Sequence, residues 1–167
     1  KRGGSLLIAD NKGSSNLLAQ ELGFRFDGSP LVDIASYVKN PYYPLIESIH
    51  PHNVSRNVNQ LVLNHPTGIV RLGIPPKDLY TYSIVAESSP MSWIDRYGNE
   101  RWDSFETLGY TSVVITLQFG EGRVVLVSDP NLFTNDMLQY GDNMVFVENV
   151  VRWLSYDNAL FPLIFLV

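Results

Sequence analysis

Carboxylate, hydroxyl and amide side chains follow three of the strands that this 167-residue sequence predicts. Such groups accept and donate hydrogen bonds, so together they could hold a small polar ligand, a sugar being one candidate. In doubly wound sheets, ligands bind where the carboxyl ends of the strands meet. We therefore predict a ligand-binding rim that consists of Asp10, Asn16, Ser88, Ser89, Asp129, Asn131, Asn135, Asp142 and Asn143.

The same residue types also have a structural use. Asn16 precedes the apolar stretch 17–22 as a helix N-cap would, and Asp129 and Asp142 stand where two later helical segments begin. Short polar side chains at such positions accept hydrogen bonds from the free amides of the first helical turn. Asp129, Asn131, Asn135 and Asp142 are more short polar residues than two caps require. Ligand binding and capping therefore both remain open.

No catalytic residue follows from the sequence. The chain has no cysteine, no Gly-x-Ser-x-Gly turn of the kind that serine hydrolases use, and no glycine-rich nucleotide loop. The alternative is a hydrolase, of the glycosidase or esterase type, that uses Asp and Glu side chains with His50 or His65. Acidic and aromatic residues alternate between positions 93 and 110, which suits a sugar-binding surface, a glycosidase surface or an ordinary loop pinned by its aromatics.

Composition and spacing also argue against metals, cofactors and nucleic acids. His50-Pro51-His52 brings two imidazoles together, but no third ligand follows nearby, so we predict no metal site and no cofactor. The balance of 12 basic and 17 acidic residues gives a formal net charge of −5, which argues against a nucleic-acid partner. The expected partner is a small polar ligand or a membrane protein.

The segments that must position these side chains indicate an α/β fold. Continuous apolar runs at residues 5–9, 82–86 and 123–127 are typical of strands buried in a parallel sheet. A polar loop and the helical stretch 17–22 follow the first run, as in the strand–loop–helix units of doubly wound sheets. We therefore predict an α/β fold with a mostly parallel, doubly wound sheet.

The C-terminal third carries the clearest pattern. Residues 112–119 and 123–128 flank Gly120-Glu121-Gly122, and two glycines that can adopt positive φ favour a tight antiparallel hairpin. A polar loop follows, and then an amphipathic helix from Asn143 to about Tyr156, whose broad apolar face would cover the sheet.

Three strings resemble a known family: Gly3-Gly4-Ser-Leu-Leu-Ile-Ala-Asp10, Asn-Leu-Leu…Leu-Gly23, and Gly120-x-Gly-Arg-Val-Val-x-Val-Ser-Asp129-x-x-x-Phe133-Thr-Asn135-x-x-Leu138-x-x-x-Asp142-Asn143…Trp153-Leu154. With these residues the chain resembles a domain-of-unknown-function family of the class I glutamine amidotransferase-like (flavodoxin-like) superfamily. Relatives in that superfamily include gliding-motility ABC-transporter accessory proteins and an intraflagellar-transport subunit. The resemblance implies a flavodoxin-like three-layer α/β/α sandwich without amidotransferase activity, because the catalytic cysteine is absent. The positions that it carries over are Asp129, Phe133, Asn135, Asp142 and Asn143.

The resemblance also bears on domain organisation and function. We expect residues 1–158 to form a single soluble α/β domain, without the family's first strand and helix, because Gly3-Gly4 resembles the start of the second strand. Residues 159–167 are apolar and predict either a last strand or the start of a truncated membrane segment. We expect a non-catalytic ligand- or partner-binding module, or an accessory domain of a membrane transport complex. The localisation is unknown; membrane anchoring through segments outside this chain is one expectation.

Overall fold

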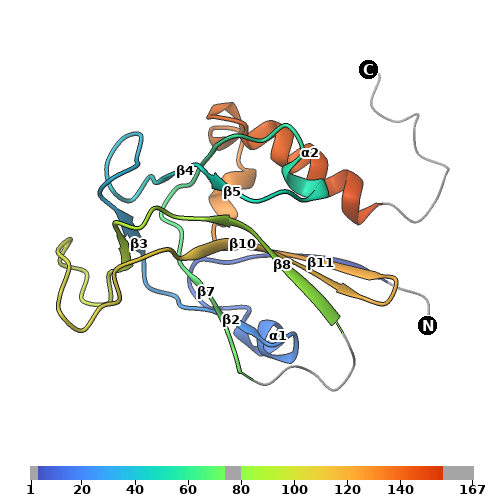
Figure 1. Ribbon diagram of the computed structural model, residues 1–167, viewed down its shortest axis with the longest axis horizontal. Helices are drawn as coiled ribbons and strands as arrows, with labels where there is room; N and C mark the ends of the chain where they lie inside the picture. The colour runs from blue at the N-terminus through green and yellow to red at the C-terminus, as the bar shows by residue number, and fades with distance from the viewer. Residues whose placement is uncertain (1–3, 74–79, 156–167) are drawn as a thin grey trace.

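A five-stranded sheet forms the centre of the computed structural model, which describes residues 4–73 and 80–155 (Figure 1). Its strands, in spatial order, are β1 (Ser5–Ala9), β11 (Gly122–Val127), β10 (Ser112–Phe119), β8 (Tyr80–Glu87) and β5 (Ser48–Ile49). Only β1 and β11 pair in parallel, whereas β11–β10, β10–β8 and β8–β5 are antiparallel.

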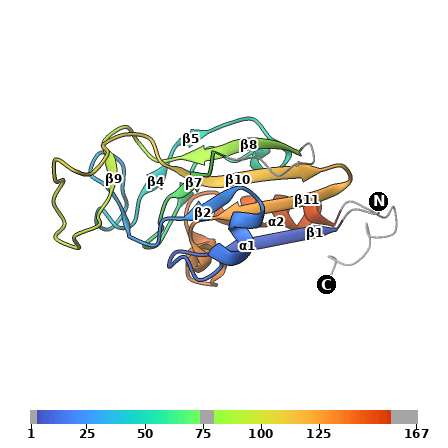
Figure 2. The ribbon, with the colours of Figure 1, turned by 90° about the horizontal axis from the view of Figure 1, so that it is seen from below.

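Shorter elements surround this sheet. Three two-stranded antiparallel sheets pair β2 (Phe24–Phe26) with β7 (Ile69–Arg71), β3 (Leu31–Asp33) with β9 (Ser92–Ile94), and β4 (Leu45–Ile46) with β6 (Leu61–Val62). The two α-helices are α1 (Asn16–Glu21) and α2 (Asn143–Leu154), and single 3₁₀ turns form η1 (Asn53–Ser55), η2 (Pro130–Phe133) and η3 (Met137–Gln139). Viewed from below, β1, β11, β10 and β8 run side by side, with β2 and α1 in front of them (Figure 2).

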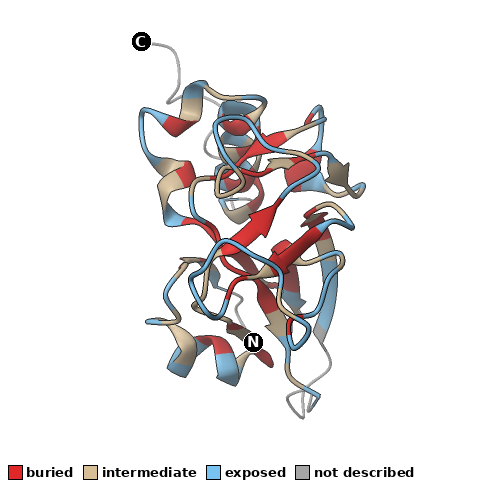
Figure 3. Ribbon diagram, turned by 90° about the vertical axis from the view of Figure 1, so that its left-hand side faces the viewer, coloured by how far each residue is buried: buried red, intermediate tan, exposed pale blue. Residues whose placement is uncertain are grey.

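The apolar core lies on both faces of the sheet. Along β11, Val125 and Val127 belong to a buried cluster that includes Phe146 of α2, whereas Val124 and Leu126 belong to a second cluster with β2. Successive side chains of a strand point to opposite faces, so a strand covered on both sides is apolar at every position. Buried residues accordingly follow the central strands, and exposed residues gather in the outer loops (Figure 3).

The prediction of a three-layer α/β/α sandwich with a mostly parallel sheet, glutamine amidotransferase-like or flavodoxin-like, is wrong. The structure consists mainly of strands in several small mixed and antiparallel sheets. After α1, the chain enters β2, which pairs with β7 instead of joining the central sheet. The apolar runs misled the prediction because an antiparallel strand with both faces covered is as continuously apolar as a parallel one.

Several individual elements agree with their sequence patterns. The hairpin β10–β11 is present, and Gly120 adopts a φ of +57° in its turn. β6 and β7 are two short strands on either side of His65-Pro66.

Asn16, predicted as an N-cap, is not one, because Ser15 holds that position and Asn16 is the first helical residue.

Residues 159–167, predicted as a last strand or the start of a membrane segment, lie outside the described residues. Within the described part of the chain, neither α-helix reaches the length and hydropathy that a bilayer span requires.

Asn143 joins α2 to β6 inside the core and gives a test of this packing. It is fully buried; its Nδ2 donates to the carbonyls of Val62 and Met137, each at 2.8 Å, and its Oδ1 accepts from the amide of Val62 at 3.0 Å. Replacing Asn143 with Leu should reduce the free energy of unfolding by about 2–4 kcal/mol, because buried backbone groups lose their partners. The exposed Asn135→Leu should cost less than about 0.5 kcal/mol in the same urea titration. Equal losses in the two variants would contradict this packing.

Candidate functional site

Three of the strand ends chosen from the sequence meet at one edge of the central sheet. β10 runs opposite to its neighbours, so β1, β11 and β8 point in the same direction, with Ala9 level with Val127 and Val114 level with both Val127 and Ala86. The residues that follow these strands, Asp10, Asp129 and Ser88, therefore lie along the same edge.

Asp10 at this edge holds its own loop. Its Oδ1 accepts the amides of Lys12 (2.7 Å) and Gly13 (3.0 Å), and its Oδ2 accepts that of Ser15 (2.6 Å). Gly13 has a φ of +77°, which allows the chain to turn back around the carboxylate. Both oxygens of Asp10 thus bind main-chain amides.

Both oxygens of Asp129 also bind main-chain amides, and these amides belong to two separate segments. Its Oδ2 accepts the amide of Asn64 at 2.6 Å, and its Oδ1 accepts the amide of Asn131 at 2.8 Å, as the N-cap of η2. Burial raises the pKa of Asp129 to about 6, although the amides of Asn64, Asn131 and Leu132 act in the opposite direction.

Ser88 and Ser89 also form hydrogen bonds within the protein. The Ser88 and Ser92 hydroxyls lie 2.6 Å apart, and Ser88 Oγ accepts the amide of Thr111 at 2.8 Å. Ser89 Oγ donates to Asp33 Oδ1 at 2.7 Å. These contacts connect β8 to β3, β9 and the start of β10.

The remaining predicted residues lie apart from this edge or serve as clamps. Asn16 donates to the carbonyl of Phe26 and accepts its amide, at 2.9 and 2.7 Å. Asn131 Nδ2 donates to the carbonyl of Asn64, Asp142 Oδ2 accepts the amides of Asn59 and Gln60, and Asn143 bridges to β6 as described above. Asn135 is exposed.

The histidines of the hydrolase alternative are held by different neighbours. His50 Nε2 lies 3.1 Å from Glu87 Oε2, and Ser112 Oγ donates to Glu87 Oε1 at 3.3 Å. A serine nucleophile would need an imidazole beside its hydroxyl, whereas the hydroxyl of Ser112 faces the Glu87 carboxylate. His65 stacks on Tyr42, with ring centroids 5.3 Å apart. Among the described residues, no three His, Asp or Glu side chains are placed to hold a metal ion.

Two buried carboxylates hold the loop between positions 95 and 110 by accepting hydrogen bonds from its main-chain amides. Asp95 and Glu106 are 1% and 5% exposed, and main-chain amides of the loop donate to both oxygens of each carboxylate. Burial acts to raise the pKa of Asp95, but the amides of Glu100, Asn99 and Gly98 outweigh it and lower the pKa below its ordinary value.

Phe105 and Tyr110 of this loop point outward, whereas Trp102 is tied to the loop by a hydrogen bond. Phe105 is 88% exposed and Tyr110 is 62% exposed, whereas the buried carboxylates occupy the interior of the loop. Trp102 is half exposed, and its Nε1 donates to the carbonyl of Glu106 at 3.0 Å. A rigid loop that presents aromatic faces to solvent is suited to binding, because little of its order must be gained when a ligand arrives.

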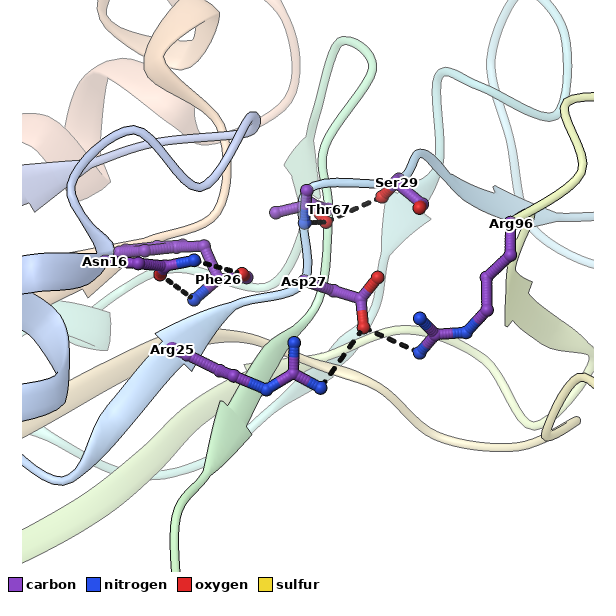
Figure 4. Close-up of polar contacts among 8 residues, drawn as sticks. Asn16, Arg25, Phe26, Asp27, Ser29, Thr67 and Arg96 are labelled. Atoms are coloured by element: carbon purple, nitrogen blue, oxygen red, sulfur yellow. Dashed lines mark hydrogen bonds and ion pairs between the residues drawn. The ribbon is translucent and has the colours of Figure 1, made fainter.

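Asp27 differs from the other buried carboxylates described here. Its side chain is 1% exposed, and its Oδ2 receives the guanidinium groups of Arg96 at 2.6 Å and Arg25 at 3.7 Å. Figure 4 shows the two arginines approaching this oxygen from opposite sides. Oδ1 of Asp27 is buried and accepts no hydrogen bond from the described residues. In Asp10, Asp33, Asp95, Glu106 and Asp129, by contrast, main-chain amides donate to both oxygens.

Asp27 also lines a hollow of about 460 Å³ between β7 and the segment 105–112. Its walls combine two guanidinium groups, two exposed aromatic rings, several hydroxyls and the backbone of β7. The lining residues are Asp27, Gly68, Ile69, Val70, Arg71, Ile94, Arg96, Phe105, Thr107, Gly109, Tyr110, Thr111 and Ser112. None of the nine residues predicted from the sequence is among them. This hollow, which we call the Asp27 hollow, is the candidate site.

Little in the sequence indicates the Asp27 hollow. Asp27 directly follows the Phe24–Phe26 strand and precedes Gly28, so it occupies the same kind of position as Asp10 and Asp129. The irregular pattern between positions 24 and 56 concealed that strand. Arg71 and Arg96 join Asp27 only through the folding of distant segments.

Comparison with known proteins places the chain in a family. The profile described as "Domain of unknown function (DUF4350)" matches residues 1–151, and the chain therefore belongs to this family. A search among curated proteins gives no match. Among solved structures, the chain is similar to the "mmIFT52 N-terminal domain", with a TM-score of 0.64 and 15% sequence identity. The alignment covers 91% of this chain and 65% of that one, and at this identity the likeness concerns the fold alone.

These findings correct the family resemblance drawn from the sequence. Neither the family match nor the structural neighbour indicates a glutamine amidotransferase-like fold, so the assignment to that superfamily is wrong, together with the relation to gliding-motility ABC-transporter accessory proteins that was drawn from it. The apolar runs and the hairpin that carried the resemblance also occur in a mainly antiparallel sheet.

The raised pKa of Asp129 predicts a pH-dependent stability. In the unfolded chain an aspartate titrates near its ordinary value, roughly 3.9, so the folded protein binds this proton more tightly between about pH 4 and pH 6. The contribution of Asp129 to the free energy of unfolding should therefore fall by about 2–3 kcal/mol as the pH rises through this range, and stay constant above it. Urea unfolding from about pH 4 to pH 7, of the wild type and of Asp129→Asn, measures the difference. If the free energies of unfolding of the two proteins change with pH in parallel, the pH dependence belongs to another group.

The two buried carboxylates of the 95–110 loop give a second test. Asp95→Ala removes the acceptor of three loop amides and should open the loop, so proteolysis between positions 96 and 110 should accelerate about tenfold or more. Asp103→Ala, which removes the acceptor of a single exposed bond from Asn99, is the control and should change the rate little. Equal protection of the loop in the wild type and Asp95→Ala would refute the role of Asp95.

Proposed function

We propose that this member of the DUF4350 family is a non-catalytic binding module, and that the Asp27 hollow takes a hydroxyl-rich ligand of the sugar class. One observation carries the proposal: Asp27 lines the hollow, and its Oδ1 is buried and accepts no hydrogen bond from the described residues. Leaving such an atom without a partner costs about 1–3 kcal/mol or more. A ligand hydroxyl can supply the donor.

The other walls suit the same ligand. The Arg96 and Arg71 guanidinium groups offer donors to ring and hydroxyl oxygens, while Phe105 and Tyr110 offer apolar faces against which a sugar ring can pack. Arg71 is oriented by a 3.1 Å hydrogen bond to the Tyr82 hydroxyl.

Charge favours an acidic sugar over a neutral one. Arg71 and Arg96 bring two positive charges to the lining of the hollow. Guanidinium groups pair with carboxylates through two parallel hydrogen bonds, so a sugar carboxylate would meet a matching partner.

The arrangement of carboxylates supports binding without catalysis. Glycoside hydrolysis uses two carboxyl groups that flank the scissile bond, and Asp27 is the one carboxylate in the lining of the hollow. Asp95 and Glu106 in the adjoining loop are engaged by main-chain amides, and the lowered pKa of Asp95 is opposite to what a general acid requires.

Titration with neutral and acidic monosaccharides, followed by ligand-observed NMR, tests the proposal. Asp27→Asn turns one acceptor oxygen into a donor and should weaken sugar binding about tenfold or more, and Phe105→Ala should weaken it by a similar factor. The matched control is Arg25→Gln, because Arg25 pairs with Asp27 but does not line the hollow. It should retain binding within about threefold.

Two results would count against the proposed function. Absence of binding to every sugar by the folded wild type would remove it. Equal weakening by Arg25→Gln and Asp27→Asn would show that Asp27 acts through its ion pairs and not through Oδ1.

A further inference from the structure

A second hollow, independent of the Asp27 hollow, lies beside the C-terminal half of α2. It has a volume of about 460 Å³, and its lining comprises three arginines, two asparagines and a tryptophan: Asn53, Arg56, Arg123, Asn149, Arg152 and Trp153. α2 covers one face of the central sheet, whereas β7 lies towards the other (Figure 1). We call this second region the arginine hollow.

The three guanidinium groups come from three separate elements. Arg56 follows η1, Arg123 lies in β11 and Arg152 lies in the last turn of α2. No carboxylate is among the lining residues, and among the described residues no ion pair engages Arg56 or Arg152. In a chain whose formal net charge is −5, this local excess of positive charge is a distinct feature.

Contacts behind the arginines hold two of them in position. Arg123 Nη1 donates to the carbonyl of Trp153 at 2.7 Å, and its guanidinium carbon lies 5.5 Å from the Trp153 ring centroid. Asn149 Nδ2 donates to the carbonyl of Arg56 at 2.7 Å and to that of Val54 at 3.3 Å, which fixes the segment that carries Arg56 against α2. The site therefore needs little rearrangement to receive a ligand.

The end of α2 does not oppose an anion as strongly as a bare helix end would. A helix C-terminus carries a partial negative charge on its free carbonyls. Here the carbonyl of Trp153 accepts from Arg123 and the carbonyl of Leu154 accepts from the Ser5 hydroxyl. Arg152 also complements this end, and that structural use alone would explain a single arginine. It does not explain why Arg56 lines the same hollow.

We propose that the arginine hollow binds a phosphate group, either of a small phosphorylated molecule or of a lipid headgroup. Guanidinium groups bind phosphate oxygens through paired, charge-assisted hydrogen bonds, and three of them can surround one such group. Asn53 at the rim adds an amide that can donate. Glu148, one helical turn before Arg152, is the acidic residue of α2 nearest in sequence and does not line the hollow.

The test uses calorimetric titration with inorganic phosphate and pyrophosphate, and flotation with phosphatidylcholine vesicles that contain or lack phosphatidylglycerol. Wild-type protein should bind pyrophosphate, anionic vesicles or both, and Arg152→Gln should weaken this binding about tenfold. Arg101→Gln, which removes the same charge from the exposed 95–110 loop, should leave it within about twofold. The double variant Arg56→Gln/Arg152→Gln should abolish binding, with folding checked by circular dichroism.

Each outcome has a defined meaning. Binding of pyrophosphate without anionic vesicles assigns a small phosphorylated ligand, and binding of anionic vesicles without pyrophosphate assigns a lipid headgroup. If neither probe binds, or if Arg101→Gln weakens binding as much as Arg152→Gln, the arginine hollow is not a phosphate site. The Asp27 hollow shares no residue with it, so the two proposals fail separately.

Discussion

Buried carboxylates that accept main-chain amides are the interaction on which the rest of this structure depends. Long stretches of the chain lie outside the five-stranded sheet, and their amides lack the regular partners that strands and helices supply. Asp10, Asp33, Asp95, Glu106 and Asp129 supply those partners, each from a position that is at least 95% buried. Loops that are held in this way can keep a fixed shape without extensive secondary structure.

This interaction also explains why the polar edge of the sheet is an unsuitable site. Asp10, Asp129 and Ser88 do meet there, but their oxygens are engaged by the protein itself. Asp27 departs from the pattern, since its contacts are guanidinium groups on one oxygen and none on the other. The distinction between scaffold and site therefore lies in what each carboxylate binds, and not in how deeply it is buried.

Sequence patterns predicted individual elements better than their assembly. The glycine pair identified the hairpin of β10 and β11, and the apolar face identified α2, because these signals are local. Strand pairing was mistaken because continuous apolar runs report burial on two faces and not parallel pairing. Asn16 was predicted to cap α1, but it clamps β2. Such a clamp depends on segments brought together by folding, as does the grouping of Asp27, Arg71 and Arg96.

The measurement closest to the central claim is the carbon-13 NMR signal of the Asp27 carboxyl group, together with backbone amide shifts, during titration with an acidic monosaccharide. A hydroxyl that donates to Oδ1 should shift the Asp27 signal and the amides of residues 68–71 and 107–112, while the carboxyl signals of Asp10 and Asp129 stay in place. Saturable shifts elsewhere in the protein, with the Asp27 carboxyl signal unchanged, would contradict the account.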